Sequence, residues 1–454
     1  MKQLNSPRLL PITAAGTLLL ALVLGGAAGS PGDFVVQLSA LLTLGVAVQA
    51  LPGAPLTPAA RIGIIFAGAA LALPLAQLIP LPAAVASVLP GRAGLASELA
   101  GIEAAGLSHA SLAPTFTERS LWALVPGVAL FAAGLALPPV WRQRLLATVV
   151  TFALASVILG LAQIAGGPNS PLRFYALTNT ADAVGFFANR NHFASLLYVA
   201  LALGVSLLAV HWRRGSNRRL HGALGATVVV FCLVGLGLAR SRMGLLLGML
   251  AMVGAAAILI SSSSSTGRAA RRWTLVTATI GVLAVVQISL YGILNRLEAD
   301  PLDDARWTFF ANTRALAAHY APLGSGLGTF VSAYQSGQTP QQQESFYVNH
   351  AHNDYLELAL EAGWPAIGWM VAFALWWLWC TFAAWRHTSG AALLARGASL
   401  GLGLLMLHAT VDYALRTEAV LAVAGLLCAV LVPSVRERLS KDICDKFAVW
   451  QQNN

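Results

Sequence analysis

The sequence predicts an all-α, polytopic membrane protein with about twelve transmembrane helices. Of its 454 residues, 57% are hydrophobic and only 10% are charged, which is more apolar surface than the core of a soluble protein can hide. Apolar runs of about 20 residues, the length that crosses a bilayer as a helix, recur along the whole chain. They lie near 11–29, 34–51, 62–80, 120–138, 145–165, 192–211, 222–239, 243–260, 274–293, 364–383, 397–414 and 419–434.

The first apolar run could be a signal peptide or a permanent helix. It follows Lys2 and Arg8 and ends in the small residues GGAAGS, a pattern that a cleavable signal peptide also shows. Because so many apolar runs follow it, we expect it to be retained as the first transmembrane helix.

The basic residues predict the orientation in the membrane, because cytoplasmic loops collect Lys and Arg. With both termini inside, the cytoplasmic segments hold 18 of the 28 lysines and arginines and three of the 18 carboxylates, a formal charge of +15 against −5 on the outer side. The overall charge of +10 then reflects short loops that face anionic membrane lipids. No nucleic-acid motif accompanies this charge, so we expect no nucleic-acid partner.

Connection lengths divide the chain into three parts. Residues 1–140 form an N-terminal group of transmembrane helices with an outer loop at 81–118, residues 141–435 form a transmembrane core, and residues 436–454 form a cytoplasmic tail. The core contains a second outer loop at 294–363, which is too long to be a simple connection. We therefore expect the functional residues on the outer face.

The long outer loop contains a predicted helix at 305–319 and a glycine-rich stretch, APLGSGLGTF. Gly324, Gly326 and Gly328 permit tight backbone turns. Their spacing is not that of a P-loop and no Lys-Ser/Thr pair follows, which argues against a nucleotide site. The four cysteines offer no disulfide framework, since Cys232, Cys380 and Cys428 fall in predicted spans and Cys444 in the tail.

Three arginines are expected at one membrane depth on the outer side. The stretch LARSRMG joins the spans at 222–239 and 243–260 almost without a loop and places Arg240 and Arg242 at the surface. The stretch FFANRNHFA places Arg190 at the mouth of the preceding span, 192–211. A single arginine here could be an interfacial anchor whose charge reaches the lipid headgroups. Three together, beside Asn189, Asn191 and His192, favour an anion site, because the guanidinium fork suits phosphate oxygens.

Four stretches together resemble the O-antigen ligase and O-antigen polymerase superfamily of bacterial envelope enzymes. They are FFANRNHFASLL at 186–197, ARSRMGLLLG at 239–248, PLGSGLGTF at 322–330 and AHNDYLELALEAG at 351–363. The late VDYALR at 411–416 is also similar, and the likeness covers roughly 180–420.

The resemblance implies an integral-membrane glycosyltransferase of the GT-C-like, mostly helical type in the bacterial inner (cytoplasmic) membrane, with its active site facing the periplasm. It implies a polyprenyl-diphosphate-linked glycan as donor, a lipid or glycan acceptor, and no cofactor or metal ion. Matched residue by residue, the diphosphate-binding arginines are Arg190 and Arg242, with Arg240 less firmly matched, and the catalytic histidine is His352. Asn189, Asn191, Asn353, Glu357 and His350 are expected to support them.

These residue types suit the implied chemistry. Fixed guanidinium groups can stabilise the charge that develops on a departing diphosphate, and a histidine can accept the proton of an acceptor hydroxyl. We expect His352 just before a helix capped by Asn353 or Asp354, where the helix dipole favours a neutral imidazole and the nearby carboxylates Asp354 and Glu357 oppose it.

Several neighbouring residues allow more than one interpretation. Glu357 and Glu361 share a helical face, which could be simply solvated. His350 and His352 could together bind a metal ion, but a helix would make their side chains diverge, so His350 is expected to line the cleft. Asp412 and Arg416, at i and i+4, are predicted to form an ion pair that orients the last two spans. His408 is expected to be buried structure, and His192 could be structural or functional.

Two other functional classes compete with a ligase. A transporter for lipid-linked sugars would also have many spans, but it needs ionisable groups at mid-membrane, whereas the polar residues here gather at the outer face. Within the enzyme class, a polymerase of O-antigen or exopolysaccharide repeat units and a protein O-glycosylation enzyme remain open.

Overall fold

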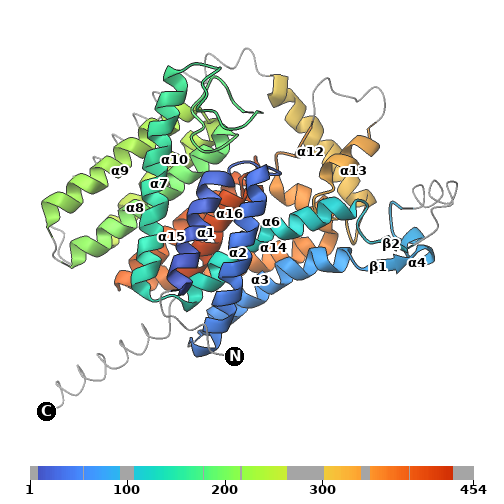
Figure 1. Ribbon diagram of the computed structural model, residues 1–454, viewed down its shortest axis with the longest axis horizontal. Coiled ribbons are helices and arrows are strands. Elements are labelled where there is room, and N and C mark those ends of the chain that lie inside the picture. The colour runs from blue at the N-terminus through green and yellow to red at the C-terminus, as the bar shows by residue number, and fades with distance from the viewer. Residues whose placement is uncertain are drawn as a thin grey trace.

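The computed structural model describes residues 9–54, 56–92, 107–176, 178–214, 217–262, 301–338, 348–387 and 389–432. Almost all secondary structure in these ranges is helical (Figure 1). The helices are α1 (Leu9–Leu24), α2 (Pro31–Ala50), α3 (Pro58–Gln77), α4 (Ala83–Ser87), α6 (Pro114–Ala136), α7 (Pro139–Ala165), α8 (Arg190–Arg213), α9 (Arg218–Ala239), α10 (Arg242–Ser262), α12 (Pro301–His319), α13 (Phe330–Ser336), α14 (Asp354–Arg386), α15 (Gly390–His408) and α16 (Glu418–Leu431). Two 3-10 turns, η1 (Leu51–Gly53) and η3 (Ala414–Arg416), and an antiparallel strand pair, β1 (Pro80–Pro82) and β2 (Leu107–His109), complete the described elements.

Within the described residues, nine helices are long and apolar enough to cross a membrane, and α1 and α16 are shorter apolar helices. These eleven helices coincide with eleven of the twelve apolar runs, so an all-α, multi-pass membrane protein is confirmed for this part of the chain. The run at 274–293 and the tail at 436–454 lie outside the described residues.

Helix α8 forms the centre of the bundle. It packs against α7, α9, α10 and α15. In its most apolar 18-residue stretch, 89% of the residues are buried, compared with 17% in the corresponding stretch of α14. Its sequence between the terminal arginines has apolar or small residues on every face, as a helix surrounded by other helices requires. Small residues allow close approach of neighbouring helices, for example where a Cβ added at Gly397 of α15 would lie 2.4 Å from Ser206 of α8.

One end of the bundle, which we call the site end, is tied together by backbone hydrogen bonds between chain segments far apart in sequence. Ala419 N donates to Gly25 O (3.0 Å), and Asp354 N donates to Ala409 O (2.8 Å). The elements α12 and α13 and the β1–β2 pair lie together beyond the ends of α3 and α6 (Figure 1). The expected helix at 305–319 is α12, and the strand pair belongs to the outer loop expected at 81–118.

Helix α14 consists of two segments that meet at Gly363. This glycine has φ of 60° and ψ of −146°, which interrupts the helix, and Trp364 N donates to Pro322 O (2.8 Å) instead of to the preceding turn. The first segment carries the polar residues, and the second, apolar segment coincides with the predicted span at 364–383. The change from a polar to an apolar sequence therefore occurs at Gly363, the residue at which the helix is interrupted.

The predicted span at 397–414 is wrong at its end. Helix α15 stops at His408, and the following residues form a turn and then η3. Asp412 N and Val411 N both donate to His408 O (3.0 Å each), which closes the helix in a tight turn. Asp412, Tyr413 and Arg416 consequently leave the helical register and can point in directions that a continuous helix would not allow.

Candidate active site

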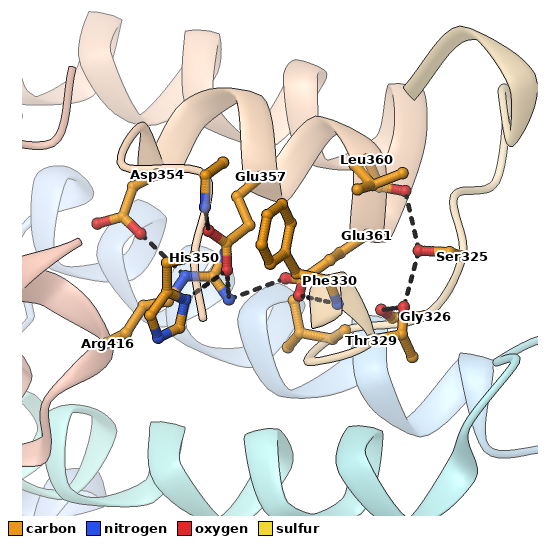
Figure 2. Close-up of polar contacts among 12 residues, drawn as sticks. Ser325, Gly326, Thr329, Phe330, His350, Asp354, Glu357, Leu360, Glu361 and Arg416 are labelled. Carbon is orange, nitrogen blue, oxygen red and sulfur yellow. Dashed lines mark hydrogen bonds and ion pairs between the residues drawn. The ribbon is translucent and has the colours of Figure 1, made fainter. Parts of the chain in front are cut away.

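Arg416 lies at the centre of a buried ionic cluster at the site end (Figure 2). Its Nε donates to Asp354 Oδ1 (2.9 Å), and its Nη1 lies 2.9 Å from Glu361 Oε2 and 3.2 Å from Glu357 Oε1. The side chains of Glu357 and Glu361 are fully buried, and that of Arg416 is 18% exposed. Burial would lower the pKa of Arg416, but the three carboxylates raise it above its ordinary value and keep the guanidinium charged.

This cluster corrects two predictions. Glu357 and Glu361 do share a helical face, but the face is buried against Arg416 and is not solvated. Arg416 does not form an i, i+4 ion pair with Asp412, because the helix ends before both residues. Its partners lie on the first segment of α14, so Arg416 connects that segment to the chain after α15.

The glycine-rich loop packs against the back of the same segment. Gly326 N donates to Glu361 O (2.8 Å). Phe330 N donates to Glu361 Oε1 (3.2 Å) (Figure 2). A Cβ added at Gly324 would lie 2.5 Å from backbone atoms of Glu361 and Ala362. Gly324, Gly326 and Gly328 all have positive φ, so the expected tight turns are present and serve close packing.

His350 belongs to the ionic cluster. Its Nδ1 lies 2.8 Å from Glu357 Oε1, and the other oxygen of that carboxylate accepts a hydrogen bond from Ala351 N (2.8 Å). The His350 ring also packs at 4.0 Å, centroid to centroid, from the ring of Tyr413. His350 therefore connects the buried carboxylates to the aromatic residue beside His352.

His352 stands directly before the first turn of α14, as expected. Asn353 is the N-cap residue, and its side chain accepts from Leu356 N (3.0 Å). His352 has φ of 51°, a left-handed conformation that a non-glycine residue rarely adopts. This conformation turns the imidazole out of the helical direction and toward Asp412, whose Oδ1 lies 3.6 Å from Nδ1.

Asp412, and not Asp354 or Glu357, is therefore the carboxylate beside the imidazole of His352. Its side chain is 1% exposed. Burial raises the pKa of Asp412, but the contact with His352 and the nearby imidazoles of His192 and His408 lower it, with a net result below its ordinary value. A carboxylate beside Nδ1 favours the tautomer protonated there, which leaves a lone pair on Nε2.

A second histidine approaches Asp412 from inside the bundle. His408 Nε2 lies 3.8 Å from Asp412 Oδ2, and its Nδ1 lies 2.9 Å from Ser195 Oγ and 3.0 Å from Tyr198 Oη. His408 is buried, as predicted, and its imidazole lies beside the aspartate.

The three arginines expected to bind a diphosphate lie at the start of α8 and at the turn between α9 and α10. Arg190, the first residue of α8, donates from Nη1 to Asp182 Oδ2 (2.6 Å), and Arg240 Nη1 lies 3.8 Å from Asp182 Oδ1. The carboxylate is 4% exposed, whereas the two arginine side chains are 23% and 57% exposed. Arg242 begins α10 one residue beyond Ser241, whose Oγ accepts from Gly244 N (3.0 Å).

Tyr413 joins the arginine-bearing helix to the histidines. Its hydroxyl accepts hydrogen bonds from Asn189 Nδ2 (3.4 Å) and Asn349 Nδ2 (3.2 Å). Its ring centroid lies 5.0 Å from that of His192 and 5.2 Å from that of His352. Asn189 is also the N-cap of α8, where it accepts from Asn191 N (2.8 Å). The residue before Arg190 is thus hydrogen-bonded to the hydroxyl group of the tyrosine whose ring packs against His352.

The two histidines of the His-x-His pair use different carboxylates. His350 contacts Glu357 and His352 contacts Asp412, so their side chains do not converge on one point. In the described part of the chain, no group of three or more His, Cys, Asp and Glu side chains is arranged to hold a metal ion.

Sequence reasoning missed three participants. Asp182 is the single acidic residue between α7 and α8, which was a usable signal, but nothing in the sequence says that it faces Arg190 and Arg240. Tyr413 and Arg416 belong to the VDYALR stretch that the family resemblance included. Their contacts depend on the end of α15 and could not be derived from spacing.

The comparison with known families agrees with the region that contains most of these residues. Residues 184–371 match the O-antigen ligase family. The matched segment includes Arg190, Arg240, Arg242 and His352. The match confirms the family resemblance seen in the sequence. It covers less than half of the 454 residues and stops before Asp412, Tyr413 and Arg416. No curated protein matches the chain. Together, this match and the apolar helices indicate a multi-pass membrane protein of O-antigen or related polysaccharide biosynthesis.

Proposed function

We propose that this protein is a membrane glycosyltransferase that transfers a glycan from a polyprenyl diphosphate to an acceptor hydroxyl at the periplasmic face of the bacterial inner membrane. The bond between C1 of the sugar and the phosphate oxygen breaks, and its electron pair stays on that oxygen. A new bond forms between C1 and the acceptor oxygen, whose proton passes to Nε2 of His352. The products are the glycosylated acceptor and a polyprenyl diphosphate.

In this reaction the arginines act on the leaving group. Arg190, Arg242 and Arg240 stand at the start of α8 and at the turn between α9 and α10, the depth at which the diphosphate of a membrane-embedded lipid would lie. Fixed guanidinium groups stabilise the negative charge that grows on the diphosphate without having to reorganise. This is the role that a metal ion has in many other transferases.

His352 acts on the acceptor as general base. Asp412 is a positioning residue, since it contacts Nδ1 and would leave Nε2 free to receive the proton. Arg416 is a second positioning residue, because it holds the first segment of α14, which follows directly after His352. His350 and Glu357 complete the support from the other side.

A single observation carries the proposal. Tyr413 contacts both Asn189, which caps the helix that begins with Arg190, and the imidazole ring of His352. Leaving-group stabilisation and proton transfer require an anion-binding group and a base on opposite sides of one sugar carbon. The contacts of Tyr413 link His352 to the residue that precedes Arg190, which supports the assignment of both residues to one site.

Reconstitution of the purified protein tests the proposal. With a polyprenyl-diphosphate glycan of defined structure and a panel of lipid and glycan acceptors, we expect a glycosylated acceptor and free polyprenyl diphosphate in equal amounts. If the glycan crosses a proteoliposome membrane without any covalent product, the protein is a transporter and the proposal is wrong.

Deletion of the gene separates a ligase from a polymerase. A ligase is expected, because the matched family is described as O-antigen ligase. Its loss should cause full-length polymer to accumulate on the lipid carrier. Single repeat units still attached to their final acceptor would instead identify a polymerase.

A further inference from the structure

Asp182 occupies a fixed position between two of the arginines. It contacts Arg190 (2.6 Å) and Arg240 (3.8 Å), and its side chain is almost completely buried, whereas the side chains of both arginines are partly exposed. An anion arriving from solvent can therefore reach the arginines without first displacing the aspartate.

The backbone on both sides of Asp182 is fastened. Arg173 Nη1 donates to Asp182 O (3.0 Å), and Ala183 N donates to Leu238 O at the end of α9 (3.1 Å). The buried Gln163 accepts from Gly185 N (3.0 Å) and donates to Gly185 O (2.8 Å). These bonds hold the loop to α7 and α9, so a shift of the Asp182 backbone away from the arginines would break them.

A fixed negative charge behind the arginines weakens their attraction for every anion. A glycosyl polyprenyl diphosphate carries one ionised oxygen on each phosphate, whereas the free polyprenyl diphosphate ends in a phosphate monoester with a second ionisation near pH 6. The product therefore carries more negative charge than the donor. Arginines without a counter-charge would hold the product more tightly than the substrate and slow its release.

We propose that Asp182 is a charge-tuning residue, which lowers the affinity of Arg190 and Arg240 for a diphosphate so that the product can leave. This inference rests on the proposed function. It assigns to Asp182 a role in product release that differs from the leaving-group stabilisation of the arginines. A purely structural aspartate would orient the arginines without limiting their affinity.

Two substitutions separate charge from structure. Asp182→Asn keeps an oxygen that can accept from Arg190 but removes the charge, whereas Asp182→Ala removes both. Glu118→Gln is the matched control, since it removes one exposed carboxylate at the first turns of α6, which also starts at the site end. The readouts are the dissociation constant for polyprenyl diphosphate in detergent, the single-turnover transfer rate and the steady-state turnover rate.

If Asp182 tunes the charge, Asp182→Asn should bind polyprenyl diphosphate at least about tenfold more tightly, a change of about 1.4 kcal/mol. Its single-turnover rate should stay within about threefold of wild type while steady-state turnover falls, because release of the product becomes slow. Asp182→Ala should bind less tightly than Asp182→Asn, since the arginines lose their anchor. Glu118→Gln should match wild type in all three measurements.

Unchanged or weaker binding in Asp182→Asn would overturn the inference, as would equal tightening in Glu118→Gln. If the wild-type protein transfers glycan and binds polyprenyl diphosphate, but Asp182→Asn binds it with the same affinity as wild type, only this inference is refuted. Failure of the wild-type protein to bind polyprenyl diphosphate at all would refute the proposed function together with it.

Discussion

The Nδ1 atom of His352 lies 3.6 Å from Oδ1 of Asp412, which connects the start of α14 to the turn after α15. His352 reaches this position through a left-handed backbone conformation, and Asp412 reaches it because α15 ends at His408. The left-handed conformation of His352 and the end of α15 at His408 belong to different segments of the chain. The contact therefore depends on how three segments of the site end are joined, and it should be sensitive to changes in any of them.

Asp412→Asn should slow transfer while leaving donor binding nearly unchanged. The substitution removes the buried negative charge that lies 3.6 Å from Nδ1, and a loss of about 1.4 to 2.8 kcal/mol of transition-state stabilisation corresponds to about ten- to a hundredfold in rate. The measurement is kcat together with the donor KM. A large rise in KM with an unchanged kcat would show that Asp412 acts on donor binding instead.

The same variant has an expected pH signature in stability. The pKa of Asp412 in the folded protein is below its ordinary value, so its carboxylate stabilises the fold above the unfolded pKa of about 4, and that stabilisation is lost as pH falls through the folded pKa. The difference in unfolding temperature between wild type and Asp412→Asn should be constant from about pH 5 to pH 8 and shrink below about pH 4. A difference that grows on acidification would contradict this sign.

Arg416→Met should destabilise the protein by about 3 kcal/mol or more, because it leaves Glu357 and Glu361 buried without their cation. Arg416→Lys should lie between this variant and wild type, since a lysine keeps the charge but cannot reach Asp354 and both glutamates in the same way. Thermal unfolding in one detergent provides the measurement. Arg314→Ala, at an exposed position of α12, is the control and should unfold like wild type.

Transfer by the purified protein should survive EDTA. The proposed charge stabilisation comes from Arg190, Arg240 and Arg242, and the carboxylate among them, Asp182, is already paired with two of these arginines. Activity is compared before and after chelation and dialysis. Complete loss with EDTA, reversed by a divalent ion, would require a metal-dependent mechanism and a new examination of His350 and His352.

The site end should face the periplasm. Only this orientation places the loops with the excess of Lys and Arg in the cytoplasm. Ser336 is an exposed residue at the end of α13, so Ser336→Cys should react with a membrane-impermeant thiol reagent in intact spheroplasts. Labelling that appears only after lysis would reverse the orientation.

Much of the fold follows from local properties of the sequence. Apolar runs long enough to cross a bilayer predicted the eleven apolar helices that the described residues contain, because hydrophobic length is the main requirement of a membrane span. The predicted start of a span at 364 also agrees with the break at Gly363. The end of α15 was placed too late, since Asp412 and Tyr413 lie close enough to an apolar run to be counted with it.

The sequence predicted those features of the site that depend on neighbouring residues, but not the contacts between distant segments. A cap at Asn353 or Asp354, with His352 just before the helix, follows from local helix signals, and the structure has Asn353 as the cap. Positive φ at the glycines follows from their chemistry. The stripe of Asp354, Glu357 and Glu361 was visible as one helical face, but its burial depends on Arg416 from a distant segment. A charged stripe looks the same in sequence whether solvent or an arginine covers it.

Donor binding and single-turnover transfer, measured on His352→Ala and Arg242→Lys in parallel, test the proposed mechanism most directly. His352→Ala should bind the donor normally and transfer about 10² to 10⁴ times more slowly, the usual contribution of a general base. Arg242→Lys should lose about ten- to a hundredfold in donor affinity or rate, because lysine keeps the charge but not the fork that holds two phosphate oxygens. Both variants must first be shown to be folded and inserted. Wild-type transfer by His352→Ala, or unchanged affinity and rate in Arg242→Lys, would contradict the roles proposed for these two residues.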